Sequence, residues 1–168
     1  MFIRAELYHK VGGLDDDFFA HMEEIDFCWR LKNSGYKIMY CPHSVIFHVG
    51  GGTLPKNNPH KTYLNFRNNL FLLYKNLPSG KLFPVFFIRF FLDGIAAIKF
   101  LFEGHVMDFF AVWKAHYAFY FAIPKLIRKR RMFKHTDVSC IYQQSIVYEH
   151  YLKGGEIFGE LDKECFSK

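Results

Sequence analysis

Apolar side chains recur three and four positions apart in five stretches of this sequence, the spacing of an amphipathic helix. The first two stretches stop at glycines, which suit helix ends. The fifth is rich in aromatic rings and runs into Pro124, where we expect it to end because proline lacks a backbone N–H. We predict helices over residues 2–12, 23–34, 61–77, 82–102 and 105–123.

Two short apolar runs, 37–41 and 45–49, follow the second predicted helix. Each has the length and composition of a strand, and three glycines close the second run. A helix followed by two strands and a glycine loop is typical of an α/β domain. We therefore predict that the fold class is α/β.

The stretch 82–102 is long enough to span a bilayer, but it carries charges. On a helical wheel, Arg89, Asp93, Lys99 and Glu103 fall in one sector, while Phe87, Phe91 and Phe102 lie opposite. This pattern favours a helix lying in the membrane interface. The alternatives are a helix that packs its Phe face into the core and, less favoured because charges are costly in hydrocarbon, a true span. Trp113 in the next stretch is likewise suited to the headgroup zone.

The net charge of +6 is concentrated in residues 125–134, which hold six basic side chains and no acidic one. A short basic block directly after apolar segments is typical of an anchor to an anionic membrane surface, although a solvated charge run explains it too. Nucleic acid is disfavoured as a partner because the basic run 128–131 has no interleaved aromatic or glycine residue. With the aromatic residues above, the predicted membrane-binding residues include Lys125, Arg128, Lys129, Arg130 and Arg131.

The densest group of chemically useful side chains is Glu23, Glu24 and Asp26, with Arg30 four residues after Asp26. An Asp26–Arg30 ion pair could position one acid and leave another free as a general base. Acids at a helix start also simply complement the helix dipole, and from the residues alone that explanation is favoured. His48 ends an apolar run before the three glycines, where a core histidine is more common than a metal ligand.

Three segments resemble family 2 glycosyltransferases, most closely the rhamnosyltransferase-like members. They are FIRAELYHKVGGLDDDFF from Phe2, EEIDFCWRLKNSGYK from Glu23 and CPHSVIFHVGG from Cys41, in the family's order and spacing. The resemblance implies a partial GT-A (Rossmann-like) catalytic domain without its N-terminal nucleotide-binding half, followed by amphipathic C-terminal helices. It divides the chain into the acceptor side of that domain (1–78), a membrane-associated extension (79–134) and a tail (135–168).

The resemblance also implies roles for particular residues. Glu24, with Glu23 beside it, matches the acidic pair that supplies the general base, although the family usually has Glu-Asp there. Asp26 and Arg30 match supporting positions, and His48 matches a histidine that helps to hold Mn²⁺ or Mg²⁺. The D-x-D motif that completes that metal site belongs to the half that this chain lacks.

The function implied is transfer of a sugar from a nucleotide-sugar donor to a glycan or lipid-linked acceptor, as in cell-surface polysaccharide synthesis. We expect the chain to be an inactive fragment by itself, with a separate chain as one possible source of the donor-binding half. The expected location is peripheral, on the cytoplasmic side of the inner membrane. The alternative is a non-catalytic membrane-peripheral adaptor with a degenerate glycosyltransferase fold.

Overall fold

The computed structural model describes residues 1–47, 58–155 and 157–167, which form two compact units, Met1–His135 and Thr136–Lys168. The described helices of the first unit are α1 (Ala5–Lys10), η1 (Asp16–Phe18), α2 (Glu23–Asn33), α3 (Pro59–Asn76), α4 (Ser79–Phe102) and α5 (Val106–Arg130). Those of the second are α6 (Ile146–Tyr151), η2 (Phe158–Glu160) and η3 (Lys163–Cys165).

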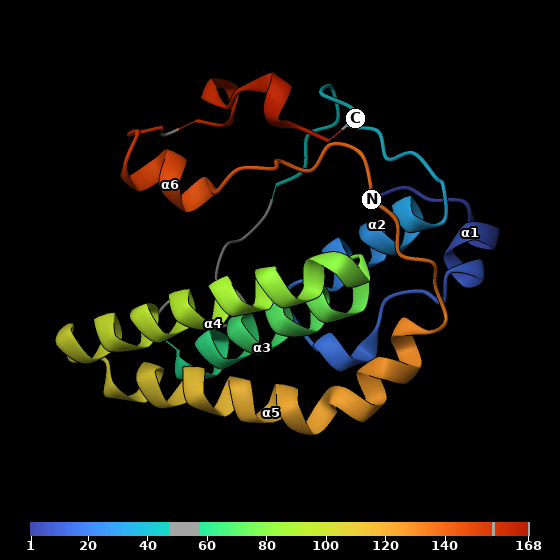
Figure 1. Cartoon of the computed structure of the whole chain (residues 1–168). Helices are drawn as coiled ribbons and strands as arrows, with labels where there is room; N and C mark the ends of the chain where they lie inside the picture. Colours follow the sequence, from blue (N-terminus) through green and yellow to red (C-terminus); the bar gives the residue numbers. More distant parts are fainter. Residues whose placement is uncertain (48–57, 156, 168) are drawn as a thin grey trace. The chain divides into compact units, whose positions relative to one another are not determined.

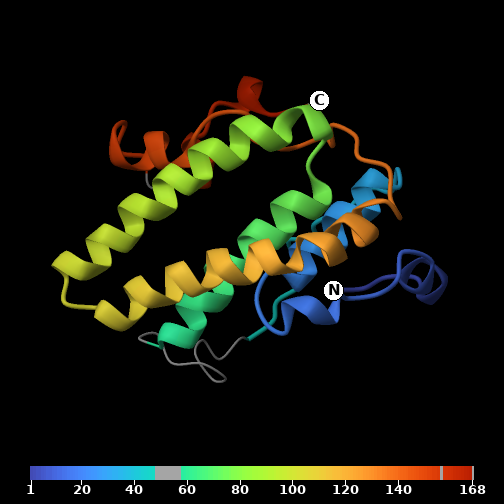
Figure 2. The same ribbon diagram turned by 60° about the horizontal axis from the view of Figure 1, so that its bottom comes forward.

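Helix α3 is the centre of the first unit. It begins at Pro59, where the Asn58 side chain accepts a hydrogen bond from a first-turn N–H, and it packs along α5 and against α2 and α4. Helices α4 and α5 run antiparallel and are joined by a short turn (Figures 1 and 2). The main core lies where the three long helices meet, with the Phe119 ring 5.4 Å from Phe86 and 6.4 Å from Phe71.

The expected α/β class is wrong for the part of the chain that the structure describes, which is helical and contains no strand. Residues 37–41 and 45–47 form no ladder with any described segment, and Phe47 is 97% exposed. Residues 48 and 49 lie outside the described residues. A strand requires a partner ladder for its backbone groups, and short apolar runs cannot reveal from sequence whether one exists. The partial GT-A (Rossmann-like) architecture inferred from the resemblance is overturned with it.

The helix predictions are largely confirmed, with three differences. Helix α4 begins at Ser79, three residues before the predicted start at 82. Helix α1 is shorter than 2–12, although Gly12 and Gly13 follow it with φ of 81° and 65°, left-handed conformations that suit glycine at a helix end. The predicted end of the fifth helix at Pro124 is wrong, because α5 continues to Arg130. Pro124 is exposed, so water can solvate the Tyr120 carbonyl that loses its donor.

Helix α4 does not bury its apolar face, as a helix of the core would. Phe87, Phe91 and Phe102, predicted to share one face, are between 68% and 88% exposed. The polar sector divides instead, because Asp93 is buried while Lys99 is exposed and pairs with Glu103. The Phe face therefore does not fill the core. None of the described helices is both long and apolar enough to cross a membrane.

Candidate functional site

The acidic end of α2 begins in an unusual backbone turn. Phe19, His21 and Met22 have φ values of 61°, 69° and 75°, in the left-handed region that residues other than glycine rarely adopt. Met22 is the N-cap residue, and no side chain caps the helix. Glu23 and Glu24 occupy the first turn, where negative charge complements the helix dipole. Such a turn persists only where surrounding contacts fix it.

Asn68 of α3 supplies those contacts. Its side chain is fully buried, and Nδ2 donates hydrogen bonds to the carbonyls of Phe18, Ala20 and His21 at 2.8, 2.7 and 2.8 Å. Arg67 donates to the Phe18 carbonyl at 3.1 Å and to Oδ1 of Asn68 at 2.7 Å. Helix α3 therefore fixes the turn that presents the α2 acids. Sequence reasoning missed Asn68, because a lone asparagine in a helix gives no signal of partners about fifty residues away.

Asp26 and Arg30 form the predicted ion pair, with Nε and Oδ2 2.8 Å apart, and both side chains are buried. The other oxygen of Asp26, Oδ1, lies 2.8 Å from Nζ of Lys75 and accepts a hydrogen bond of 2.8 Å from Nδ2 of Asn76. Arg30 also donates to the Gly13 carbonyl at 2.6 Å. These contacts tie α2 to α3 and to the loop before it. The Asp26–Arg30 pair thus stabilises the structure around the site, and the charges of both side chains are unavailable to a ligand.

Glu23 and Glu24 differ from Asp26 in exposure and in partners. Glu24 is exposed, whereas Glu23 is half-buried. Oε2 of Glu23 is buried and has no hydrogen-bond partner among the residues that the structure describes. The same is true of Nε2 of His21 and Nε1 of Trp29. Buried polar atoms without partners are uncommon in folded proteins, so this segment retains unused hydrogen-bonding capacity beside an accessible carboxylate.

A second acidic group lies on the loop that precedes α2. Asp15 is the N-cap of η1 and Asp17 lies within it, and three lysines face the two aspartates. Asp15 lies 2.5 Å from Nζ of Lys75 and 2.5 Å from Nζ of Lys129, and Asp17 lies 2.5 Å from Lys125 and 2.6 Å from Lys129. The loop is thereby ion-paired to both α3 and α5. A pocket of about 300 Å³ at this place is lined by Asp15, Asp17, Lys75 and Lys129, whose charges already have partners.

The pKa values of these groups follow from the same contacts. Burial raises the pKa of Asp15, but hydrogen bonds from Lys129 and Lys75 outweigh it and hold that pKa well below its usual range. The pKa of Asp17 is lowered in the same way, against burial, by Lys125 and Lys129. Burial lowers the pKa of Lys129, but its hydrogen bonds to Asp15 and Asp17 raise that pKa above its ordinary value. Asp15, Asp17 and Lys129 are therefore charged at neutral pH.

The predicted membrane-binding cations fall into two groups. Lys125 and Lys129 face the acidic loop, and Arg130 donates to the Tyr74 carbonyl at 2.6 Å. Arg128 on α5 and Arg131, the C-cap residue of that helix, are exposed. The sequence could not separate these groups, because the acids that neutralise Lys125 and Lys129 lie more than 100 residues earlier in the chain.

The predicted aromatic members of the membrane-binding set lie on the surface of α4 and α5. Trp113 is 52% exposed, and the three predicted Phe side chains on α4 are more exposed still. Exposed neighbours extend this apolar surface: Phe83, Ile88, Ile95, Ile98, Phe110, Tyr117 and Phe121. A surface with this many large apolar side chains exceeds the scattered exposure that is normal for a soluble domain.

The expected metal site cannot be built from the residues in view. His48 lies outside the described residues. Within ranges 1–47, 58–155 and 157–167, no three His, Cys, Asp or Glu side chains gather as a set that could hold a metal ion. Asp15 and Asp17 are occupied by lysines.

Comparison with known proteins gives one weak similarity. The chain is 25% identical over 111 residues to the "Low-salt glycan biosynthesis hexosyltransferase Agl10" of Haloferax volcanii, a match that covers 63% of this chain and 35% of that protein. The chain thus spans about a third of the length of the relative that it matches. No family model and no solved structure matches it. The similarity suggests a glycosyltransferase and no finer class.

Proposed function

We propose that this chain is part of a glycosyltransferase that moves a sugar from a nucleotide-sugar donor to a glycan or lipid-linked acceptor. The observation that carries the proposal is the turn at the start of α2, which Asn68 holds and which presents Glu24 to solvent. The weak similarity to a hexosyltransferase and the motifs shared with family 2 glycosyltransferases support the same conclusion.

In this proposal Glu24 is the general base on the acceptor side. Its carboxylate takes the proton of the acceptor hydroxyl as the hydroxyl oxygen forms a bond to the anomeric carbon, and the bond from that carbon to the nucleoside diphosphate breaks. Asp26 and Arg30 hold the helix, and Asn68 holds the turn. Donor binding is the task of a further part of the enzyme, in a longer form of this protein or in a separate chain, where a Mn²⁺ or Mg²⁺ site belongs.

The test uses the longest protein that the gene encodes. Transfer is measured as nucleoside diphosphate released from a panel of nucleotide hexoses in the presence of a membrane lipid extract. Glu24→Gln keeps the shape of the side chain and removes the base, so kcat should fall about 10²- to 10⁴-fold. Glu6→Gln is the matched control, since Glu6 is an exposed acid in the first turn of α1 and should leave kcat unchanged. Equal rates for wild type and Glu24→Gln would refute the assignment.

The apolar surface supports a second proposal, peripheral attachment to an anionic membrane such as the cytoplasmic leaflet of an inner membrane. Trp113, Tyr117, Arg128 and Arg131 follow one another at steps of 4, 11 and 3 residues along α5, which places them on one helix face. Aromatic rings followed by exposed cations are the two signals that stable peripheral binding requires. A non-catalytic adaptor would retain this attachment and show no sugar transfer with any donor, so the assay above separates the two functions.

A further inference from the structure

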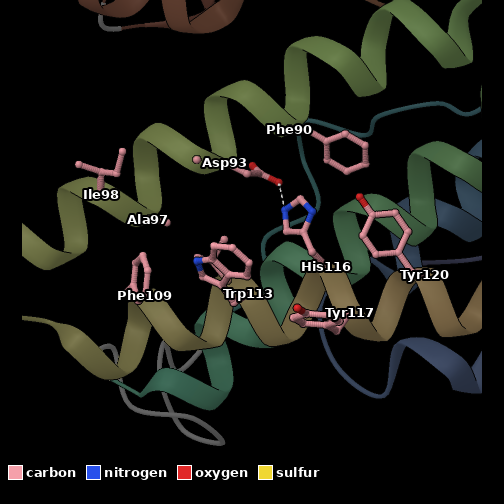
Figure 3. A pocket seen from close by; sticks show the side chains of 11 residues that line it. Phe90, Asp93, Ala97, Ile98, Phe109, Trp113, His116, Tyr117 and Tyr120 are labelled. Atoms are coloured by element: carbon pink, nitrogen blue, oxygen red, sulfur yellow. Dashed lines mark hydrogen bonds and ion pairs between the residues drawn. The ribbon is translucent and has the colours of Figure 1, made fainter.

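A pocket of about 480 Å³ lies between α4 and α5, outside the acidic site (Figure 3). Its walls are almost entirely apolar and aromatic, and the polar exceptions are a buried aspartate and a histidine. The lining residues that matter here are Gly94, Ala97 and Ile98 of α4 and Phe109, Trp113 and Tyr117 of α5. Its volume falls within the range of small-molecule binding sites.

The polar part of the pocket is Asp93 with His116, and Asp93 also pairs with Arg89, which does not line the pocket. Asp93, which is 2% exposed, lies 2.9 Å from Nε of Arg89 through Oδ1 and 3.1 Å from Nε2 of His116 through Oδ2. Figure 3 shows the imidazole between Asp93 on one side and Phe90 and Tyr120 on the other. Because a carboxylate paired with an arginine only accepts hydrogen bonds, Nε2 of His116 carries the hydrogen.

This arrangement defines what the second ring nitrogen can do. With the hydrogen on Nε2, Nδ1 has a lone pair and accepts a hydrogen bond whenever the ring is neutral. In the described part of the chain, Nδ1 of His116 has no hydrogen-bond partner. A ligand that donates to Nδ1 therefore finds an acceptor fixed in orientation by Asp93, at the polar end of an apolar pocket.

We propose that this pocket binds a single-chain amphiphile, a hydrocarbon chain that ends in an uncharged hydroxyl group. The hydrocarbon fits the aromatic walls between α4 and α5, and the hydroxyl donates to Nδ1 of His116. A carboxylate head is a poorer match, since it has no hydrogen to donate and meets the charge of Asp93. An ammonium head is also poorer, because both oxygens of Asp93 are already engaged. The site stands apart from sugar transfer, because α4 and α5 alone form it.

The test is a titration followed by the fluorescence of Trp113, which lines the pocket. The chain has two tryptophans, and Trp29→Phe removes the other signal together with a buried Nε1 that has no partner in the described structure. The probes are 1-decanol and decyl methyl ether, which share a chain but differ in the O–H donor. One hydrogen bond predicts that 1-decanol binds roughly 3- to 10-fold more tightly than the ether.

Two matched glycine substitutions test whether the probe binds in this pocket. Gly94 lines the pocket, and a Cβ there meets no atom within 4 Å, so Gly94→Leu adds side-chain volume at the pocket wall from an unobstructed Cβ. The substitution also replaces glycine by a better helix former. We expect it to weaken 1-decanol binding at least tenfold. Gly80 is also in α4, is equally open and lies outside the pocket, so Gly80→Leu should bind like the parent.

Three results overturn the proposal: a signal that never saturates, equal affinities for 1-decanol and the ether, or unchanged binding by Gly94→Leu. The first is the result expected if the probe only coats the exposed apolar surface. His116→Phe keeps an aromatic ring and removes Nδ1, so it should erase the preference for the alcohol while leaving ether binding within about twofold. These measurements need no sugar donor, so their failure leaves the glycosyltransferase proposal standing, and the failure of that proposal leaves them interpretable.

Discussion

Three carboxylates within four residues of one helix have three different environments. Asp26 is sealed among Arg30, Lys75 and Asn76, so it stabilises the fold and cannot meet a substrate. Glu24 is open to solvent, and Glu23 is half-buried with one oxygen unpaired in the structure as described. Sequence spacing predicted the Asp26–Arg30 pair, because a helix brings positions i and i+4 together. It could not rank the exposure of the two glutamates, which depends on what packs around the turn.

Asn68 offers the clearest test at the scale of one side chain. Asn68→Ala leaves the carbonyls of Ala20 and His21 without their donor and removes one donor from the Phe18 carbonyl, which Arg67 still reaches. A buried hydrogen-bonding group that loses its partner costs about 1–3 kcal/mol. We expect the free energy of unfolding to fall by roughly 3 kcal/mol, since the backbone can relax in part. Urea denaturation followed by circular dichroism measures the change.

The neighbouring side chain provides the control for this substitution. Asn69 is half-buried on the same helix, and Asn69→Ala should change the free energy of unfolding by less than about 1 kcal/mol. Asn68→Asp keeps the size of the side chain and removes both N–H donors, so it should be at least as damaging as the alanine. Full stability of Asn68→Asp would show that the three carbonyls do not depend on this amide.

At the scale of elements, the helices were predictable and the strands were not. A helix that buries one stripe must repeat its apolar residues every three or four positions, so α2 and α3 are visible in the sequence within two residues at each end. Residues 37–41 and 45–49 have the composition of strands, but strand formation depends on a partner elsewhere in the chain. The exposure of the Phe face of α4 could not be predicted either. A helical wheel shows which residues share a face, but it does not show whether another segment covers that face.

Helix α5 yields a prediction about Pro124, which sits inside the helix rather than at its end. An interior proline removes one backbone hydrogen bond and crowds the carbonyl four residues earlier, at a cost of about 3 kcal/mol relative to alanine. Pro124→Ala restores the donor to the Tyr120 carbonyl, so we expect thermal unfolding to occur at a higher temperature, with a gain of about 1–3 kcal/mol.

A second proline serves as the control for that change. Pro78 is the N-cap of α4 with φ of −54°, a position where proline costs no helical hydrogen bond. Pro78→Ala should therefore bring no stabilisation and a small loss, because the unfolded chain becomes more flexible. Equal effects of the two substitutions on the unfolding temperature would show that Pro124 does not destabilise α5.

At the scale of the molecule, the structure separates charge that stabilises the fold from charge that remains free. Lys125 and Lys129 bind the acidic loop to α5 and thereby connect residues more than 100 positions apart. Arg128 and Arg131 lie on the adjacent face, which also carries the exposed aromatic rings of α5. The membrane proposal therefore predicts that Arg128 and Lys125, which look equivalent in the sequence, differ in their effect on lipid binding.

Flotation with lipid vesicles tests that difference. The protein should float with vesicles of phosphatidylcholine and phosphatidylglycerol and much less with phosphatidylcholine alone, because a basic residue near an anionic surface contributes about 1 kcal/mol. Arg128→Gln should weaken binding by roughly fivefold, and adding Arg131→Gln should weaken it by a similar factor again. Lys125→Gln removes the same charge from the same helix, but its partner is Asp17, so the loss should be smaller. Equal losses for Arg128→Gln and Lys125→Gln would show that net charge alone governs binding. If flotation changes neither with the charge of the lipid nor with Phe87→Ser, the exposed surface of α4 and α5 is not the membrane contact.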